Sequence, residues 1–265
     1  MTRPMIFFLI VLAVFIFAQI LLTLLPIDPR LGIIFAQFAV LLGGALIYRR
    51  KFAKPQPTWP SLRRLGMGLP ALGMVLVASV VLGFLANMLG GLTIQIFPNL
   101  IPMAEQYQDQ IQGILLPESK RAQFLGIVAI VVAAPICEEF LFRGTLLPEQ
   151  RRSQIPAQAI LLNGLLFSAM HLNPVALVSL TLVGAYFAHI TLKSGSLWGA
   201  ILGHAALNLV NGVILLRLAA DVADPAEVGW TEVLIGLAVL APLTALLWWA
   251  SVRLIPDADD PVSDG

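Results

Sequence analysis

The sequence predicts an all-α polytopic membrane protein with about eight transmembrane helices. Hydrophobic residues make up 58% of the 265 residues and charged residues only 12%, and the mean hydropathy is +0.89. Soluble domains contain roughly 45–50% apolar and about 25% charged residues. The apolar residues form unbroken runs rather than the alternating pattern of a membrane β-barrel. A helical bundle in a bilayer is therefore expected, and a net charge of +1 gives no indication of nucleic-acid binding.

Eight apolar segments come close to or exceed the roughly 20 residues that a spanning helix needs. They are residues 5–25, 31–48, 65–92, 122–146, 157–172, 174–192, 196–216 and 231–250. The first is interpreted as a retained helix, because its apolar run is too long for the core of a signal peptide and no small-x-small cleavage site precedes the polar turn PIDPR.

Basic residues set the predicted orientation, because they are enriched in cytoplasmic loops. In an eight-helix count they fall on one side: Arg3, Arg49, Arg50, Lys51, Lys54, Arg63, Arg64, Arg151, Arg152, Lys193 and Arg253. The loops on the other side are mixed or acidic. Both termini are therefore predicted to be cytoplasmic, and the compact loops suggest a bacterial or archaeal plasma membrane.

Two segments are predicted not to cross the membrane. Residues 103–115 place apolar side chains on one helical face, which predicts an amphipathic helix on the outer interface. That face consists of Tyr107, Ile111, Ile114 and Leu115. The C-terminal segment PDADDPVSDG is acidic and has no apolar pattern, so we expect a disordered tail.

Polar side chains inside the spans are concentrated in spans four to seven. A charge at mid-bilayer costs roughly 2.5–3.5 kcal/mol on insertion scales, so such residues usually face the bundle interior and mark function. They are Glu138, Glu139, Arg143, Asn163, His171, His189, His204, Asn208 and Asn211. We therefore divide the chain into an N-terminal membrane region (1–115), a functional core (116–216) and a final helix with its acidic cytoplasmic tail (217–265).

Helical spacing separates the two adjacent glutamates. Glu139 and Arg143 are four residues apart, within ion-pair reach on one face. Glu138 is rotated by about 100° from Glu139. The arginine can therefore neutralise Glu139 as a structural pair, which leaves Glu138 for another partner.

Two more pairs share a helical face at the same spacing, Phe167 with His171 and His204 with Asn208. At 1.5 Å of rise per residue, Glu138 and His204 lie at similar depths from the cytoplasmic end of their spans, and His171 comes out about 8 Å deeper. Helix tilt, or a fifth span that starts later, would absorb that difference.

Converging carboxylate and imidazole groups support hydrolysis of a carbonyl compound. Glu138 can act as a general base on a water, and His171 and His204 can orient that water or stabilise an oxyanion. The same three side chains can instead bind a divalent metal such as zinc. Asn208 can donate a hydrogen bond to the oxyanion.

Several of the polar residues also have structural explanations that do not involve catalysis. His189 is expected to bond a neighbouring backbone carbonyl, and Asn163 and Asn211 are suited to hydrogen bonds between helices. Cys137 is interpreted as a small buried hydrophobe, and Ser194 or Ser196 as the N-cap of the seventh span. Acidic residues and histidines also build proton relays.

Three motifs, in order on successive polar spans, resemble those of a known family. They are EEFLFR from Glu138, FSAMH from Phe167 and HAALN from His204, and KSGSLWGAIL leads into the last. The set is similar to the CPBP family of intramembrane proteases, also called the CAAX protease and bacteriocin-processing or Abi family. The eukaryotic prenyl-protein CAAX endopeptidase belongs to it, and the resemblance covers about residues 120–212.

The resemblance implies an intramembrane endopeptidase whose catalytic cavity is formed by helices four to seven. Glu138 would activate the water, and His171 and His204 would bind that water or a metal. Asn208 would help to stabilise the oxyanion. The implied supporting residues are Glu139, Arg143 and Phe167. The family motifs leave open whether a metal takes part.

The implied partners are membrane lipids and a protein or peptide substrate, either a lipid-modified (prenylated CAAX-type) C-terminus or a peptide or bacteriocin precursor. The motifs of zinc, aspartyl and rhomboid-type serine proteases (HExxH, GxGD and GxSG) are absent from the sequence. Two other functions remain open. One is a non-catalytic membrane scaffold or bacteriocin-immunity protein, and the other is a proton-coupled carrier.

Overall fold

The computed structural model describes residues 3–52, 60–214 and 229–257, and every regular element in these ranges is helical. This confirms the all-α prediction. Within the same ranges, six helices are long and apolar enough to cross a membrane. They are α1 (Arg3–Thr23), the continuous helix Pro29–Lys51, α4 (Leu69–Ile96), the continuous helix Lys120–Gln150, α10 (Leu177–Ser194) and α13 (Trp230–Leu254).

Two further apolar helices are shorter than a full span. They are α9 (Pro156–Met170) and the helix Trp198–Ile214, which is α11 (Trp198–Leu207) followed by the π-helical segment η5 (Asn208–Ile214). All eight predicted apolar segments are therefore helical, while the prediction that the fifth and seventh cross the membrane rests on sequence alone. Since a full span needs about 20 residues, these two helices reach less far.

Two of these long helices, Pro29–Lys51 and Lys120–Gln150, are built from several segments. Pro29–Lys51 consists of α2 (Pro29–Ala36), π-helical η1 (Gln37–Leu42) and α3 (Gly43–Lys51). Lys120–Gln150 consists of α6 (Lys120–Ile127), η3 (Val128–Ala133), α7 (Ala134–Leu141), η4 (Phe142–Leu146) and α8 (Leu147–Gln150), with η3 and η4 again π-helical. A π-helical turn adds a residue to the turn and re-aims the side chains around it, and such turns are frequent at functional sites.

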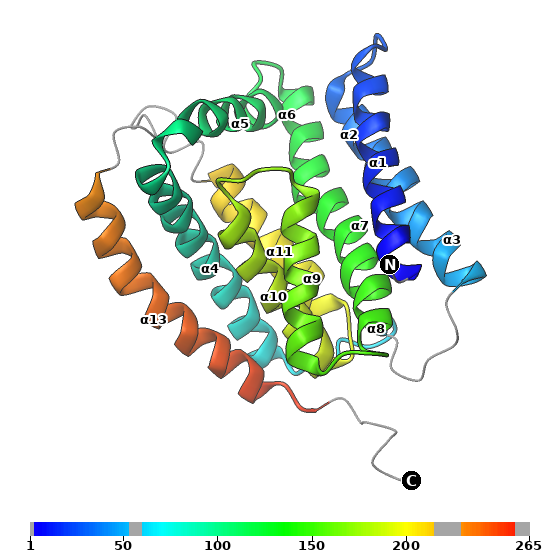
Figure 1. Cartoon of the computed structure of the whole chain (residues 1–265), viewed down its shortest axis with the longest axis vertical. Helices are drawn as coiled ribbons and strands as arrows, with labels where there is room; N and C mark the ends of the chain where they lie inside the picture. Colours follow the sequence, from blue (N-terminus) through cyan, green and yellow to red (C-terminus); the bar gives the residue numbers. More distant parts are fainter. Residues whose placement is uncertain (1–2, 53–59, 215–228, 258–265) are drawn as a thin grey trace.

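The helices run back and forth in a bundle with α10 and α11 inside (Figure 1). The helices α1 to α3 lie on one side of the Lys120–Gln150 helix, and α13 lies on the opposite side of the molecule against α4. The helix ends that carry Lys51, Lys193 and Arg253 lie at one end of the bundle, as the charge pattern requires. Lys54 and the acidic residues 258–265 lie outside the described residues.

The predicted amphipathic helix is α5 (Ile101–Leu115), which follows the short 3-10 helix η2 (Pro98–Leu100) and runs across the other end of the bundle (Figure 1). Arg30 fixes its C-terminal end, because its Nε donates to the Ile114 carbonyl at 2.9 Å and its Nη2 donates to the Gly113 carbonyl. Gly126 allows α6 to come close, since a Cβ there would lie 2.2 Å from the Ile114 oxygen.

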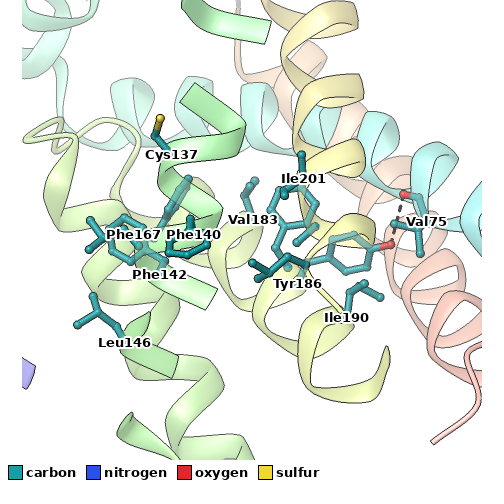
Figure 2. Close-up of a cluster of buried hydrophobic side chains, with 14 of the residues drawn as sticks. Val75, Cys137, Phe140, Phe142, Leu146, Phe167, Val183, Tyr186, Ile190 and Ile201 are labelled. Atoms are coloured by element: carbon teal, nitrogen blue, oxygen red, sulfur yellow. Dashed lines mark hydrogen bonds between the residues drawn. The ribbon is translucent and has the colours of Figure 1, made fainter. Parts of the chain in front are cut away.

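The core is rich in aromatic side chains, which lie between the Lys120–Gln150 helix, α9, α10 and α4 (Figure 2). Phe142 and Phe167 meet edge to face with ring centroids 5.3 Å apart. The Tyr186 hydroxyl donates to the Val75 carbonyl at 3.4 Å and so links α10 to α4. Cys137 is fully buried in this cluster, which confirms its prediction as a core residue.

Candidate active site

The charged residues in the middle of the Lys120–Gln150 helix are buried. Glu138 is 6% exposed, and Glu139 and Arg143 are inaccessible to solvent. Arg143 Nη1 donates to Glu139 Oε1 at 2.9 Å, so the ion pair expected from the four-residue spacing forms. Breaking such a pair is costly, because it would leave one charge buried without compensation.

The Arg143 guanidinium also contacts backbone and aromatic groups from other helices. Its Nη2 donates to the Gly184 carbonyl of α10 at 2.8 Å, and its Cζ lies 4.6 Å from the centroid of the Phe167 ring. The backbones of α9 and α10 are close here, since a Cβ on Gly164 would lie 2.4 Å from the Thr181 oxygen. Arg143 thus ties three helices together around the two glutamates.

His204 contacts Glu139 rather than Glu138. Its Nδ1 lies 2.9 Å from Glu139 Oε1, the same oxygen that accepts from Arg143. A carboxylate oxygen can only accept, so Nδ1 carries the hydrogen, and the neutral ring then has Nε2 as an acceptor. The ring is 5% exposed and stacks on Phe187 at 5.5 Å. Glu139 therefore fixes the orientation and tautomer of His204.

Glu138 faces the N-terminal part of the chain. Gln37, the first residue of η1, donates from Nε2 to Glu138 Oε1 at 3.3 Å. Gln37 is not among the site residues predicted from the sequence, because those come from the polar positions of spans four to seven. An amide inside the apolar segment 31–48 was the signal that could have identified it.

Tyr107 of α5 lies near the same carboxylate. Its side chain is 41% exposed, yet burial raises its pKa and the negative charge of Glu138 raises it further. The helix across the bundle end therefore places a phenol within electrostatic range of Glu138. The sequence predicted Tyr107 only as part of an apolar face.

His171 directly follows α9 at the bundle end where α5 lies (Figure 1). Its Nδ1 donates to the Phe167 carbonyl at 2.9 Å. The Phe167 ring lies between the two histidine rings, with centroid distances of 5.0 Å to His171 and 5.8 Å to His204. The difference in depth between Glu138 and His171 is smaller when it is measured from the observed helix ends. Because the fourth helix continues to Gln150, Glu138 lies 12 residues, about 18 Å, from its end, and His171 lies 15 residues, about 22 Å, from Pro156.

The amide side chains connect helices at π-helical segments. Asn208 starts η5, and its Nδ2 donates to the Ile130 carbonyl of η3 at 2.9 Å. Asn163 Nδ2 donates to the Phe142 carbonyl of η4 at 2.9 Å, and Asn211 Nδ2 donates to the Val80 carbonyl at 3.3 Å. Asn163 and Asn211 thus make the expected hydrogen bonds between helices.

The structure corrects the predictions for His189 and for the N-cap of the seventh helix. His189 was expected to bond a backbone carbonyl, which is wrong: its Nδ1 accepts from the Trp248 indole Nε1 of α13 at 3.0 Å. The prediction of Ser194 or Ser196 as the N-cap of the seventh helix is wrong, because Leu197 occupies that position. Ser196, one residue earlier, accepts from the Trp198 amide at 3.2 Å. It also donates to the Arg64 carbonyl at 2.8 Å, which anchors the basic loop before α4. Ser194 instead ends α10.

A metal ion at Glu138, His171 and His204 finds little support in the donor geometry. Among the residues that the structure describes, no three His, Cys, Asp or Glu side chains form a metal-binding group. The described side chains therefore do not present a preformed three-ligand set. Nδ1 of both His171 and His204 is hydrogen bonded, so Nε2 is the ring atom of each that could act as a ligand.

An apolar hollow of about 410 Å³ lies between the Lys120–Gln150 helix and α11. It is lined by Leu62, Val131, Val132, Pro135, Ile136, Phe140, Trp198, Ile201, Leu202 and Ala205. Two of these, Ile201 and Ala205, flank His204 along α11. The hollow thus lies between the fourth and seventh of the four helices that were predicted to surround a cavity.

Residues 120–210 match the family model described as type II CAAX prenyl endopeptidase Rce1-like. The match covers Glu138, Phe167, His171, His204 and Asn208, on which the resemblance was based. Among curated proteins and among solved structures, nothing matches the chain. The family consists of peptidases, and the apolar helices indicate an integral membrane protein. Residues 120–210 are thus a domain similar to the CAAX-protease family of membrane peptidases.

Proposed function

We propose that this protein is an intramembrane endopeptidase in which Glu138 activates the attacking water. The observation that carries the proposal is the different environment of the two adjacent carboxylates. Glu139 accepts hydrogen bonds from both Arg143 and His204, whereas Glu138 accepts one from the neutral amide of Gln37. Two neighbouring carboxylates in different environments can take different roles. Glu139 is inaccessible to solvent, whereas Glu138 is 6% exposed, so Glu138 is the carboxylate that a water can reach.

The proposed reaction begins when Glu138 takes a proton from a water whose oxygen attacks the scissile carbonyl carbon. The carbonyl becomes a tetrahedral oxyanion. As the intermediate collapses, the C–N bond breaks and Glu138 returns the proton to the leaving amine. One general base of this kind contributes roughly 10²–10⁴-fold to the rate.

The oxyanion requires hydrogen-bond donors on the other side of the carbonyl. Asn208 has two Nδ2 hydrogens, and the bond to the Ile130 carbonyl uses only one of them. His171 and His204 each have an Nε2 that is not engaged by the hydrogen bond at Nδ1. Asn208 is suited to donate to the oxyanion, whereas Nε2 of the two histidines is an acceptor when Nδ1 carries the hydrogen and is suited to orient the water. No step of the proposal passes through a metal.

The proposed substrate is a protein or peptide with an apolar, membrane-embedded part. A lipid-modified CAAX-type C-terminus and a peptide precursor both have this property. The apolar hollow between the fourth and seventh helices, lined in part by Ile201 and Ala205, offers a surface for such a part. Burying its apolar surface would contribute roughly 25 cal/mol per Å².

The test compares purified wild type and Glu138→Gln in lipid nanodiscs, with a fluorogenic farnesylated CAAX-type peptide and a panel of peptide precursors as probes. Cleavage by wild type and loss of at least about 10²-fold in kcat/KM by Glu138→Gln are expected. New peptide termini in cells that express wild type, but not the variant at matched levels, would identify natural substrates. Full turnover by Glu138→Gln would overturn the proposal and favour a scaffold or immunity protein.

A further inference from the structure

We propose that Gln37 is a positioning residue that holds the Glu138 carboxylate in place for its reaction with water. The inference rests on the proposed function of Glu138. It adds a residue from the second helix, which lies outside the matched residues 120–210. Gln37 and Glu138 are 101 positions apart, and their hydrogen bond of 3.3 Å joins η1 to α7.

Burying the Gln37 amide costs free energy unless the amide has a hydrogen-bond partner. Gln37 lies in an apolar helix and is only 6% exposed, and burying an amide without hydrogen bonds costs roughly 1–3 kcal/mol by protein mutational data. Its neighbours on the inner side, Ala36 and Leu41, are fully buried against the bundle. The π-helical turn that begins at Gln37 re-aims the side chains of this helix, and η1 packs directly on α7.

Only the Nε2 atom of the Gln37 amide is hydrogen bonded to the carboxylate. Nε2 donates to Glu138 Oε1, while Oε1 of Gln37 is buried and has no hydrogen-bond partner within the described ranges. A water that gives one hydrogen to Glu138 has a second hydrogen that also needs an acceptor. Gln37 Oε1 is attached to the amide group that already binds the carboxylate, so it is suited to accept that hydrogen and to fix the direction of the water lone pair.

This role predicts an effect on turnover rather than on substrate binding. A lost hydrogen bond to a charged group is worth about 1.5–3 kcal/mol, which corresponds to roughly 10- to 100-fold in rate. Gln37→Met keeps the length and shape of the side chain but removes donor and acceptor. We expect kcat on the farnesylated peptide to fall by this factor, with KM changed by less than about two-fold, because the water and not the substrate loses its orientation.

Three variants separate positioning from a general loss of structure. Gln37→Asn keeps the amide on a shorter side chain and should recover part of the lost kcat. Gln19→Met makes the same change at a half-buried position of α1 and should leave kcat unchanged. Gln37→Met added to Glu138→Gln should cause no further loss, because the amide acts through the carboxylate. Wild-type kcat for Gln37→Met, or an equal loss for Gln19→Met, would overturn the inference.

A second measurement does not depend on any substrate. The infrared band of the Glu138 carboxyl group can be assigned as the band that disappears in Glu138→Gln. It should shift in Gln37→Met and stay in place in Gln19→Met, and an unshifted band in Gln37→Met would refute the hydrogen bond. Activity retained by Glu138→Gln would instead refute the proposed function. The two failures can thus be told apart.

Discussion

The carboxylate of Glu139 lies 2.9 Å from Nδ1 of His204, although 65 positions separate the two residues. This contact joins the fourth and seventh helices inside the bundle. It also means that the supporting glutamate, and not the proposed catalytic one, orients the histidine. Any account of the site must therefore treat Glu139, Arg143 and His204 as one hydrogen-bonded unit.

The first prediction concerns the stability of this unit. Arg143→Met leaves the Glu139 carboxylate buried without its cation, so we expect a loss of roughly 3–5 kcal/mol in unfolding free energy. Glu139→Gln should cost a similar amount, because it leaves the guanidinium uncompensated. The double variant Glu139→Gln/Arg143→Met should recover part of the loss. Thermal unfolding in detergent measures all three, and additive losses would contradict a coupled pair.

The second prediction concerns the proposed catalytic side chains. Alanine at Glu138, His171 or His204 should each abolish cleavage while the protein still inserts into the membrane. His204→Ala should also release Glu139 from one of its two donors and lower the melting temperature, whereas His171→Ala should not, because its Nδ1 bonds only the Phe167 carbonyl next to it in α9. Peptide cleavage and melting curves on the same preparations check both statements. Retained turnover in any one variant would remove that residue from the mechanism.

The third prediction uses Tyr107 as a reporter of the Glu138 charge. Burial and the Glu138 carboxylate raise its pKa above 10.0, so the folded protein keeps the phenol neutral where the unfolded chain ionises. Its contribution to stability is therefore complete below pH 10 and is lost as the pH rises through the folded-state pKa. Titration of tyrosinate absorbance in wild type and Tyr107→Phe isolates this group.

In Glu138→Gln the negative charge is gone, and the midpoint assigned to Tyr107 should move down. In Glu105→Gln, which neutralises an exposed carboxylate of α5 itself, we expect a smaller movement, because Glu105 is not among the groups that raise this pKa. Equal shifts in both variants would mean that Tyr107 senses net charge rather than Glu138.

The fourth prediction concerns the close crossing of α9 and α10. A Cβ at Gly164 would lie 2.4 Å from the Thr181 oxygen and 2.9 Å from the Ala185 nitrogen, both backbone atoms that cannot move away alone. Gly164→Ala should therefore destabilise the protein by roughly 1–3 kcal/mol. Gly73→Ala in α4 is the control, since nothing lies within 4 Å of its Cβ, and it should be neutral or stabilising by up to about 1 kcal/mol. Chemical denaturation of both variants would show the contrast, and equal effects would be inconsistent with a close backbone contact.

The fifth prediction concerns metal removal. Because no three potential ligands group together in the described part of the chain, we expect cleavage to survive dialysis against a strong chelator. Added zinc should not raise the rate. A loss of activity on chelation that zinc restores would show that substrate or membrane binding assembles a ligand set from Glu138, His171 and His204.

The sequence by itself determined the features that depend on local pattern. Long apolar runs are soluble only in lipid or in a protein core, so the helical membrane fold and its eight apolar segments follow from composition. The spacing of Glu139 and Arg143 fixed their ion pair because residues four apart meet on any helix. The order of the three motifs was enough to predict the family that residues 120–210 match.

Only the tertiary structure decided which groups face each carboxylate. The contacts of Glu139 with His204 and of Glu138 with Gln37 join segments that are 65 and 101 positions apart, and no periodicity relates such segments. The π-helical turns at Gln37 and Asn208 also changed the direction of side chains that a regular helix would place elsewhere. Which glutamate binds His204 and which binds Gln37 thus depends on how the helices pack, because packing brings together the partners that are distant in sequence.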